Sequence, residues 1–160
     1  MADFKNKYGT STAITITLAS LASSATASRE STAIDNGTNL FVDALLYVAV
    51  KLQAGTPAND KAIYVYGYGS EDGTNYTDNA TGSDAALTQR VPTNLRLIGV
   101  IAAPDAGGLT YKGVYTVAQA FGGVLPRKWG IVIQNYTNVT LSATGGDHAV
   151  TYTGIHYQSV

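Results

Sequence analysis

The stretch LFVDALLYVAVKLQ, residues 40–53, is the longest apolar run in the chain and the one that most constrains the fold. In an extended chain, alternate side chains fall on opposite sides. One side then carries Asp43, Tyr47 and Lys51. The other side is apolar and consists of Val42, Ala44, Leu46, Val48, Val50 and Leu52. A helix is the competing interpretation, but three valines and the placement of both charges on one side favour a strand.

Apolar patterns of the strand type recur along the rest of the chain. The further segments are residues 14–18, 62–68, 95–102, 113–121, 129–135, 139–142 and 149–157. Glycine, asparagine, aspartate and proline separate them, as turns require. About eight short strands without a convincing helix in 160 residues predict an all-β, single-domain antiparallel β-sandwich that is jelly-roll-like. An immunoglobulin-like sandwich is the nearest alternative, because a pattern alone does not give strand connectivity.

Within this domain we expect Trp129 in the core, since apolar strand residues follow it. Residues 1–12 are expected to form an extended N-terminal arm that orders on contact with a neighbour, and residues 13–160 the sandwich. Lys5 and Lys7 before the apolar residues 13–21 resemble the start of a secretory signal. The strict alternation of residues 13–18 and the presence of Asp3 favour a strand instead.

Composition argues against several classes of function. Ten Lys and Arg against 11 Asp and Glu leave a net charge of −1, which provides no field for gripping nucleic acid. Cysteine is absent, so disulfides, thiolate metal sites and cysteine nucleophiles are excluded. No apolar run is long enough to span a bilayer, so no membrane partner is expected.

The residues available for catalysis are few, and we expect a protein that is not an enzyme and needs no cofactor or metal. The two histidines, His148 and His156, would lie too far apart along one strand to share a metal. No Gly-x-Ser-x-Gly elbow is present. The two glutamates, Glu30 and Glu71, fall in loop-like sequence, so no carboxylate pair for glycoside hydrolysis is indicated.

Residues 69–90 form a long polar segment without strand periodicity. Its acidic residues are Glu71, Asp72, Asp78 and Asp84. Acidic oxygens suggest calcium, but their spacing matches no known calcium loop. We therefore expect a solvated loop, or one that orders against a neighbouring subunit.

Tyr64, Tyr66 and Tyr68 alternate along one expected strand, so that their rings project from one side while Ile63 and Val65 point into the core. An open ladder of this kind suits a protein interface or a platform for sugar rings. The alternative is that residues 69–90 or the N-terminal segment cover it. Together with Phe4 and Tyr8 of the arm, the three tyrosines are the candidate interface residues.

Three stretches of sequence resemble small structural proteins of tailed bacteriophages. These are TITLASLASS (residues 15–24) running into RESTAIDN (29–36), LPRKWGIVIQN (125–135) and HAVTYTG (148–154). The chain is most similar to capsid decoration, or cement, proteins, and the resemblance carries no catalytic residues with it.

This resemblance implies a β-sandwich or jelly-roll protein on the outer capsid surface of a virion, assembled in the cytoplasm of the host bacterium. Its implied partners are the major capsid protein and further copies of itself, as a dimer or trimer. The low net charge suits close packing of identical copies. A carbohydrate-binding module of a phage tail, using the tyrosine ladder, is the alternative function.

Overall fold

The fold is a sandwich of two antiparallel β-sheets, seen here in a computed structural model that describes residues 3–105 and 107–159. Within these residues lie ten strands: β1 (Phe4–Ala13), β2 (Ala27–Glu30), β3 (Ile34–Asp35), β4 (Asp43–Lys51), β5 (Ala62–Ser70), β6 (Ala85–Thr88), β7 (Arg96–Ala102), β8 (Thr110–Thr116), β9 (Lys128–Tyr136) and β10 (Ala149–Ser159). Short helical turns are α1 (Asn36–Asn39), η1 (Ala118–Phe121) and η2 (Gly145–Asp147). The predicted all-β sandwich is confirmed.

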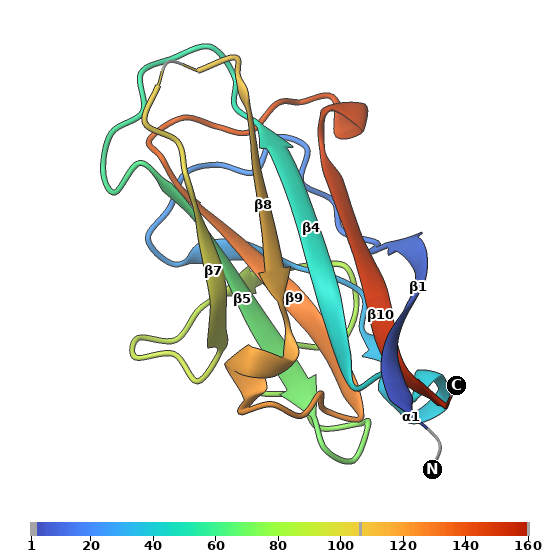
Figure 1. Cartoon of the computed structure of the whole chain (residues 1–160). Helices are drawn as coiled ribbons and strands as arrows, with labels where there is room; N and C mark the ends of the chain where they lie inside the picture. The colour runs from blue at the N-terminus through green and yellow to red at the C-terminus, as the bar shows by residue number, and fades with distance from the viewer. Residues whose placement is uncertain (1–2, 106, 160) are drawn as a thin grey trace.

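The strand order is that of a jelly roll. The first sheet has the order β1-β10-β4-β8, and the second has the order β6-β2-β9-β5-β7, with β3 also paired to β9. The first strand thus pairs with the last, β2 with β9, β4 with β8, and β5 with β7. In this nested pairing, early strands pair with late strands, as in a long antiparallel ribbon that is folded over on itself. The sequence pattern had left this strand connectivity open. Figure 1 shows the two layers and both chain ends near α1.

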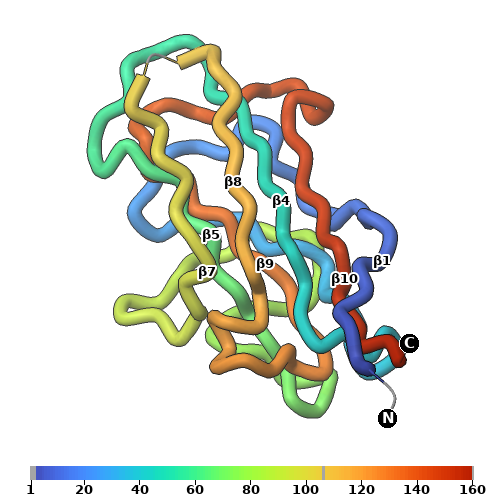
Figure 2. The backbone as a smooth tube through the Cα atoms, in the orientation of Figure 1, coloured from blue at the N-terminus to red at the C-terminus, as the bar shows by residue number. Residues whose placement is uncertain are grey.

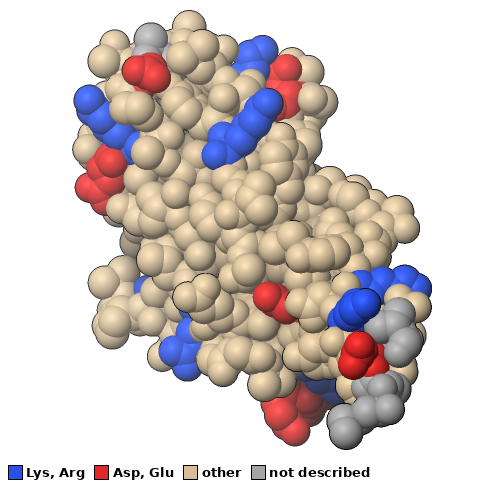
Figure 3. All heavy atoms as spheres, viewed as in Figure 1, with Lys and Arg blue, Asp and Glu red and all other residues tan. Residues whose placement is uncertain are grey.

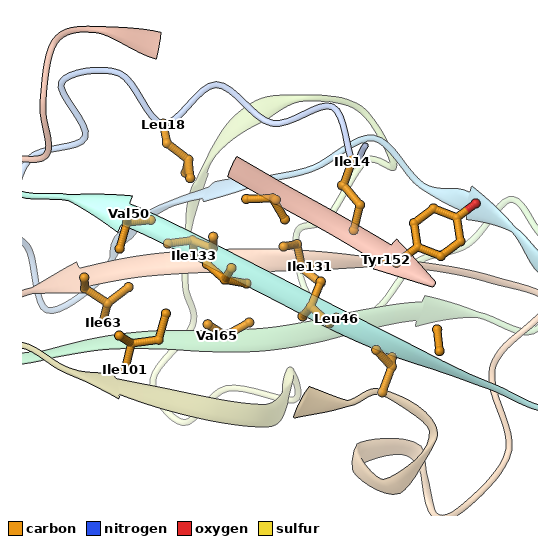
Figure 4. Packing of buried hydrophobic residues seen from close by; sticks show 14 of the residues in the cluster. Ile14, Leu18, Leu46, Val50, Ile63, Val65, Ile101, Ile131, Ile133 and Tyr152 are labelled. Carbon is orange, nitrogen blue, oxygen red and sulfur yellow. The ribbon is translucent and has the colours of Figure 1, made fainter. Parts of the chain in front are cut away.

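The core lies between the two sheets and is built from the residues that alternate inward. From the first sheet come Leu46, Val48 and Val50 of β4 and Tyr152 of β10; the second sheet contributes Ile63, Val65, Ile131 and Ile133 (Figure 4). Trp129 of β9 is fully buried, as expected, and its ring meets that of Tyr152 edge-on at 5.6 Å between centroids. This contact joins the two sheets.

Five of the predicted strands correspond to β4, β5, β7, β9 and β10. The predicted strand at residues 14–18 is absent. Ile14 and Leu18 are buried as a strand pattern requires, but the segment belongs to no β-ladder. The Thr17 N–H donates to Asp84 instead of to a neighbouring strand. Residues 139–142 form only the isolated bridge between Leu141 and Leu52, and the segment 113–121 divides into the end of β8 and η1.

The strands β2, β3 and β6 were missed. Glu30 lies at the end of β2, not in a loop, and β6 lies inside the expected loop 69–90. The expected arm, from Phe4 onward, is the edge strand β1, which already pairs with β10 of its own chain while all ten of its residues stay exposed.

Candidate interaction surface

The tyrosine ladder is open only in part. Tyr64 and Tyr66 are half-buried on the outer side of β5, with their rings stacked at 6.1 Å between centroids and 26° between planes. Tyr68 is fully buried, so the expectation that it belongs to an exposed interface was wrong. Only two rings of the expected three remain for a binding platform.

The connection between β5 and β7 covers Tyr68. This connection passes behind β5 and β9 in the view of Figure 2, and its Tyr76 packs edge-on against Tyr68 at 5.5 Å. The Tyr68 hydroxyl donates to the Ser31 carbonyl at 2.6 Å, and its ring lies over Gly130, where a Cβ atom would clash with it. Burial raises the pKa of Tyr68, in keeping with a structural role.

The Tyr64 hydroxyl donates to Asp60 at 2.6 Å, and this bond, followed by burial, raises the pKa of Tyr64 to about 12. The bond stabilises the protonated phenol, so the Asp60→Asn variant is expected to lower that pKa toward 10. A tyrosine pKa that is raised in the folded state stabilises that state at any pH below the ordinary tyrosine pKa of 10.0. This stabilisation is lost as the pH rises through about 12. Ultraviolet titration of the wild type, Asp60→Asn and Tyr64→Phe isolates this group, and an unchanged titration in Asp60→Asn would contradict the assignment.

The acidic residues of the loop serve its own architecture. Asp72 accepts the Thr74 and Asn75 N–H groups at 2.7 and 2.8 Å, and these bonds hold its pKa well below the usual value. Asp78 accepts from Thr93 and from both nitrogens of Asn94. Local donors therefore occupy the carboxylate oxygens of two of the four acidic residues that suggested calcium.

Asp84 ties the loop to the second sheet. It accepts from Arg29 Nε at 2.6 Å and from the N–H and hydroxyl of Thr17. Burial disfavours the charged form, but the Arg29 and Thr17 hydrogen bonds outweigh it and hold the pKa of Asp84 below its usual value. Over residues 3–105 and 107–159, no three His, Cys, Asp or Glu side chains come together as a group that could hold a metal ion.

The two histidines lie in separate structural settings. The ring of His148 sits between the Lys51 N–H, which donates to Nδ1 at 3.4 Å, and the Ser142 carbonyl, 3.0 Å from Nε2. His156 packs edge-on against Phe41 at 4.8 Å. The two rings therefore share no contact partner.

Four large apolar side chains gather at the end of the sandwich where the chain begins and ends. Phe4, Leu40, Val124 and Tyr157 are 75%, 72%, 74% and 67% exposed. We call this set the terminal surface. Three of these side chains, Leu40, Val124 and Tyr157, line an open hollow of about 910 Å³. Asn6 also lines the hollow, and Phe4 lies two positions from Asn6 on the same side of β1.

Backbone conformation pushes two of these side chains outward. Leu40 ends α1 in the left-handed region, with φ of 55°, where its side chain points away from the turn. Val124 follows Gly122 and Gly123, which have φ of 80° and 97° and no neighbouring atoms around the position of a Cβ. A chain that turns through two left-handed glycines presents the next residue to solvent.

The lining of the hollow contains little charge. Within the hollow, Asp43 is the charged side chain, and its Oδ1 accepts the N–H groups of Ala44 and Ala118 at 2.7 and 2.8 Å. Figure 3 shows few charged side chains across the middle of the face that it views, while most of them lie toward the two ends of the molecule, including the end that carries the chain termini. An apolar rim around an open hollow, with its one carboxylate already bonded, suits contact with another macromolecule.

Among the described residues, no helix has the length and apolar character needed to cross a membrane. Comparison with family models, curated proteins and solved structures found no match.

Proposed function

We propose that this protein is a noncatalytic structural protein of a phage virion, a capsid decoration or cement protein. In this proposal it binds the outer head surface, contacts the major capsid protein and neighbouring copies of itself, and stabilises the contacts between capsid subunits. It reaches this location by assembly in the cytoplasm of the host bacterium. The observation that carries the proposal is the terminal surface, with four exposed apolar side chains, three of which line an open hollow.

Three further features support this function. The jelly roll is a recurrent fold of viral capsid proteins, although lectins share it and a fold alone does not assign a function. The three stretches that resemble phage structural proteins point to the same class. On a symmetric shell, each modest contact is repeated many times, and the repeated contacts act together as multivalent binding. A small apolar surface is therefore sufficient for each copy.

The proposal predicts saturable cosedimentation with expanded capsid shells that lack this protein. Binding at a fixed ratio to the major capsid protein, with raised resistance of the shells to heat, is the expected result. The Val124→Asp variant should bind at least about tenfold more weakly, because a charge would be desolvated in an apolar contact.

Val91→Asp is the matched control, since Val91 is a loop valine that is 82% exposed and does not belong to the terminal surface. It adds the same charge and should bind shells as the wild type does. Equal weakening by both variants would show a general charge effect, and absence of any shell binding would contradict the proposal.

A carbohydrate-binding module of a phage tail is the second candidate. The stacked, half-buried pair Tyr64 and Tyr66 favours it, because aromatic faces at an accessible surface suit sugar rings. Failure to bind shells, together with glycan-induced changes in the NMR signals of these two tyrosines, would replace the first function with this one.

A further inference from the structure

Strand β1 is an open sheet edge with an unusual degree of exposure. Its only strand partner within the described chain is β10, and every residue from Phe4 to Ala13 is exposed. An edge strand of this kind presents unpaired backbone N–H and C=O groups to any extended segment that approaches it.

The regular part of this edge is short and well defined. Pairing with β10 runs without interruption from Phe4 opposite Ser159 to Tyr8 opposite Ile155, and the register shifts between Tyr8 and Ser11. A bulge twists the strand and ends a regular ladder. The template for a further strand is therefore residues 4–8.

The two sides of this template differ in chemistry. Lys5 and Lys7 project from one side, opposite Gln158 and His156 of β10. Neither lysine forms an ion pair with any of the described residues. Phe4 and Tyr8, both exposed, project from the other side, the side of Tyr157 and the terminal surface.

Two lysines on one side discriminate among possible strand partners. Antiparallel pairing with a second copy centred on Asn6 would set Lys5 of one copy opposite Lys7 of the other. Like charges directly opposite each other destabilise a strand pair, whereas opposite charges stabilise it. The edge thus disfavours a second copy of itself and favours an acidic segment.

We propose that β1 accepts an extended acidic segment of another protein as a fifth strand of the first sheet. Acidic side chains at alternate positions face Lys5 and Lys7. The position between them faces Asn6, and apolar side chains at the two flanking positions face Phe4 and Tyr8. This inference rests on the proposed function and deepens it, because it gives the chemistry of the partner segment next to the terminal surface.

The test uses the full chain, labelled with ¹⁵N, and a capped nine-residue peptide in which glutamate alternates with valine and threonine. We expect chemical-shift changes and slowed amide exchange at residues 4–8, and binding that weakens as salt is added. The Lys5→Glu/Lys7→Glu variant should bind this peptide about tenfold more weakly and should instead bind a peptide with lysine in place of glutamate.

Lys61→Glu/Lys112→Glu is the control, since it makes the same change of net charge and Lys112 lies on β8, the opposite edge of the same sheet. It should leave the affinity for the glutamate peptide unchanged. Equal affinity of the wild type for both peptides, or shift changes centred on β8, would overturn the proposal. Dimerisation of the protein through β1 would overturn it as well and would identify a second copy as the occupant.

Shell binding separates this inference from the proposed function. If the Lys5→Glu/Lys7→Glu variant binds shells as the wild type does, the strand-addition site is wrong and the decoration function stands. If no variant binds shells while the charge exchange with the peptides succeeds, the site stands and the decoration function fails.

Discussion

Replacement of Trp129 by alanine is expected to lower the free energy of unfolding by about 3–5 kcal/mol. The side chain is fully buried and is among the largest in the core. It also makes the edge-on contact with Tyr152 that joins the two sheets. Truncation therefore removes buried apolar area and leaves a cavity between strands that cannot collapse without shifting a sheet. Urea unfolding followed by circular dichroism measures the loss.

The Trp129→Phe variant tests whether the indole N–H contributes to stability. The indole Nε1 is buried and has no hydrogen-bond partner among the described residues. Phenylalanine keeps an aromatic ring against Tyr152 and removes a desolvated donor, so its cost should be about 1–2 kcal/mol, well below that of alanine. Similar costs for the two variants would contradict the unpaired state of the indole N–H.

Replacement of Glu30 by alanine is expected to cost about 3 kcal/mol and to release the connection that covers Tyr68. The Glu30 carboxylate is buried, and no described cation forms an ion pair with it. It accepts the N–H and the hydroxyl of Thr81, both at 2.8 Å, and the N–H of Gly82 at 3.4 Å. Loss of the carboxylate removes all of these bonds and leaves a cavity beside β2.

Hydrogen exchange at Thr81 and Gly82, together with urea unfolding, measures this effect. The amides of both residues should exchange faster in Glu30→Ala, and the Tyr68 ring should become more accessible. Asp72→Ala is the control, because Asp72 organises an exposed turn of the same connection beside the end of β5 and bonds to neither Thr81 nor Gly82. Unchanged exchange at Thr81 in Glu30→Ala would show that other contacts hold the connection in place.

Polar residues explain the strands that sequence reasoning missed. β2 buries Ser28 and Glu30, and their partners, the Leu87 carbonyl and Thr81, lie more than 50 positions away along the chain. Alternation of apolar residues is a local signal, whereas a buried carboxylate is tolerated only where distant donors satisfy it. No pattern around Glu30 identifies those donors.

The tyrosines show the same difference within one strand. Alternation correctly placed Tyr64 and Tyr66 on the outer side of β5, since the side of a strand depends only on its period of two. The burial of Tyr68 depends on Tyr76, Ser31 and Gly130, which approach from three other segments. Covering by residues 69–90 was one of two predicted arrangements, and the local pattern of residues does not distinguish it from an open ladder.

Alternating apolar residues were enough to predict the sandwich and its inward-facing residues in β4 and β5, because burial in a strand follows a local period. The apolar residues after Trp129 were enough to predict its buried position. The terminal surface arises differently. Phe4, Leu40, Val124 and Tyr157 come from four separate segments, and they meet because the jelly roll pairs its first strand with its last and brings the turns after α1 and η1 to the same end. Strand register and sheet closure create that surface through contacts between residues far apart in the chain, and no local pattern encodes them.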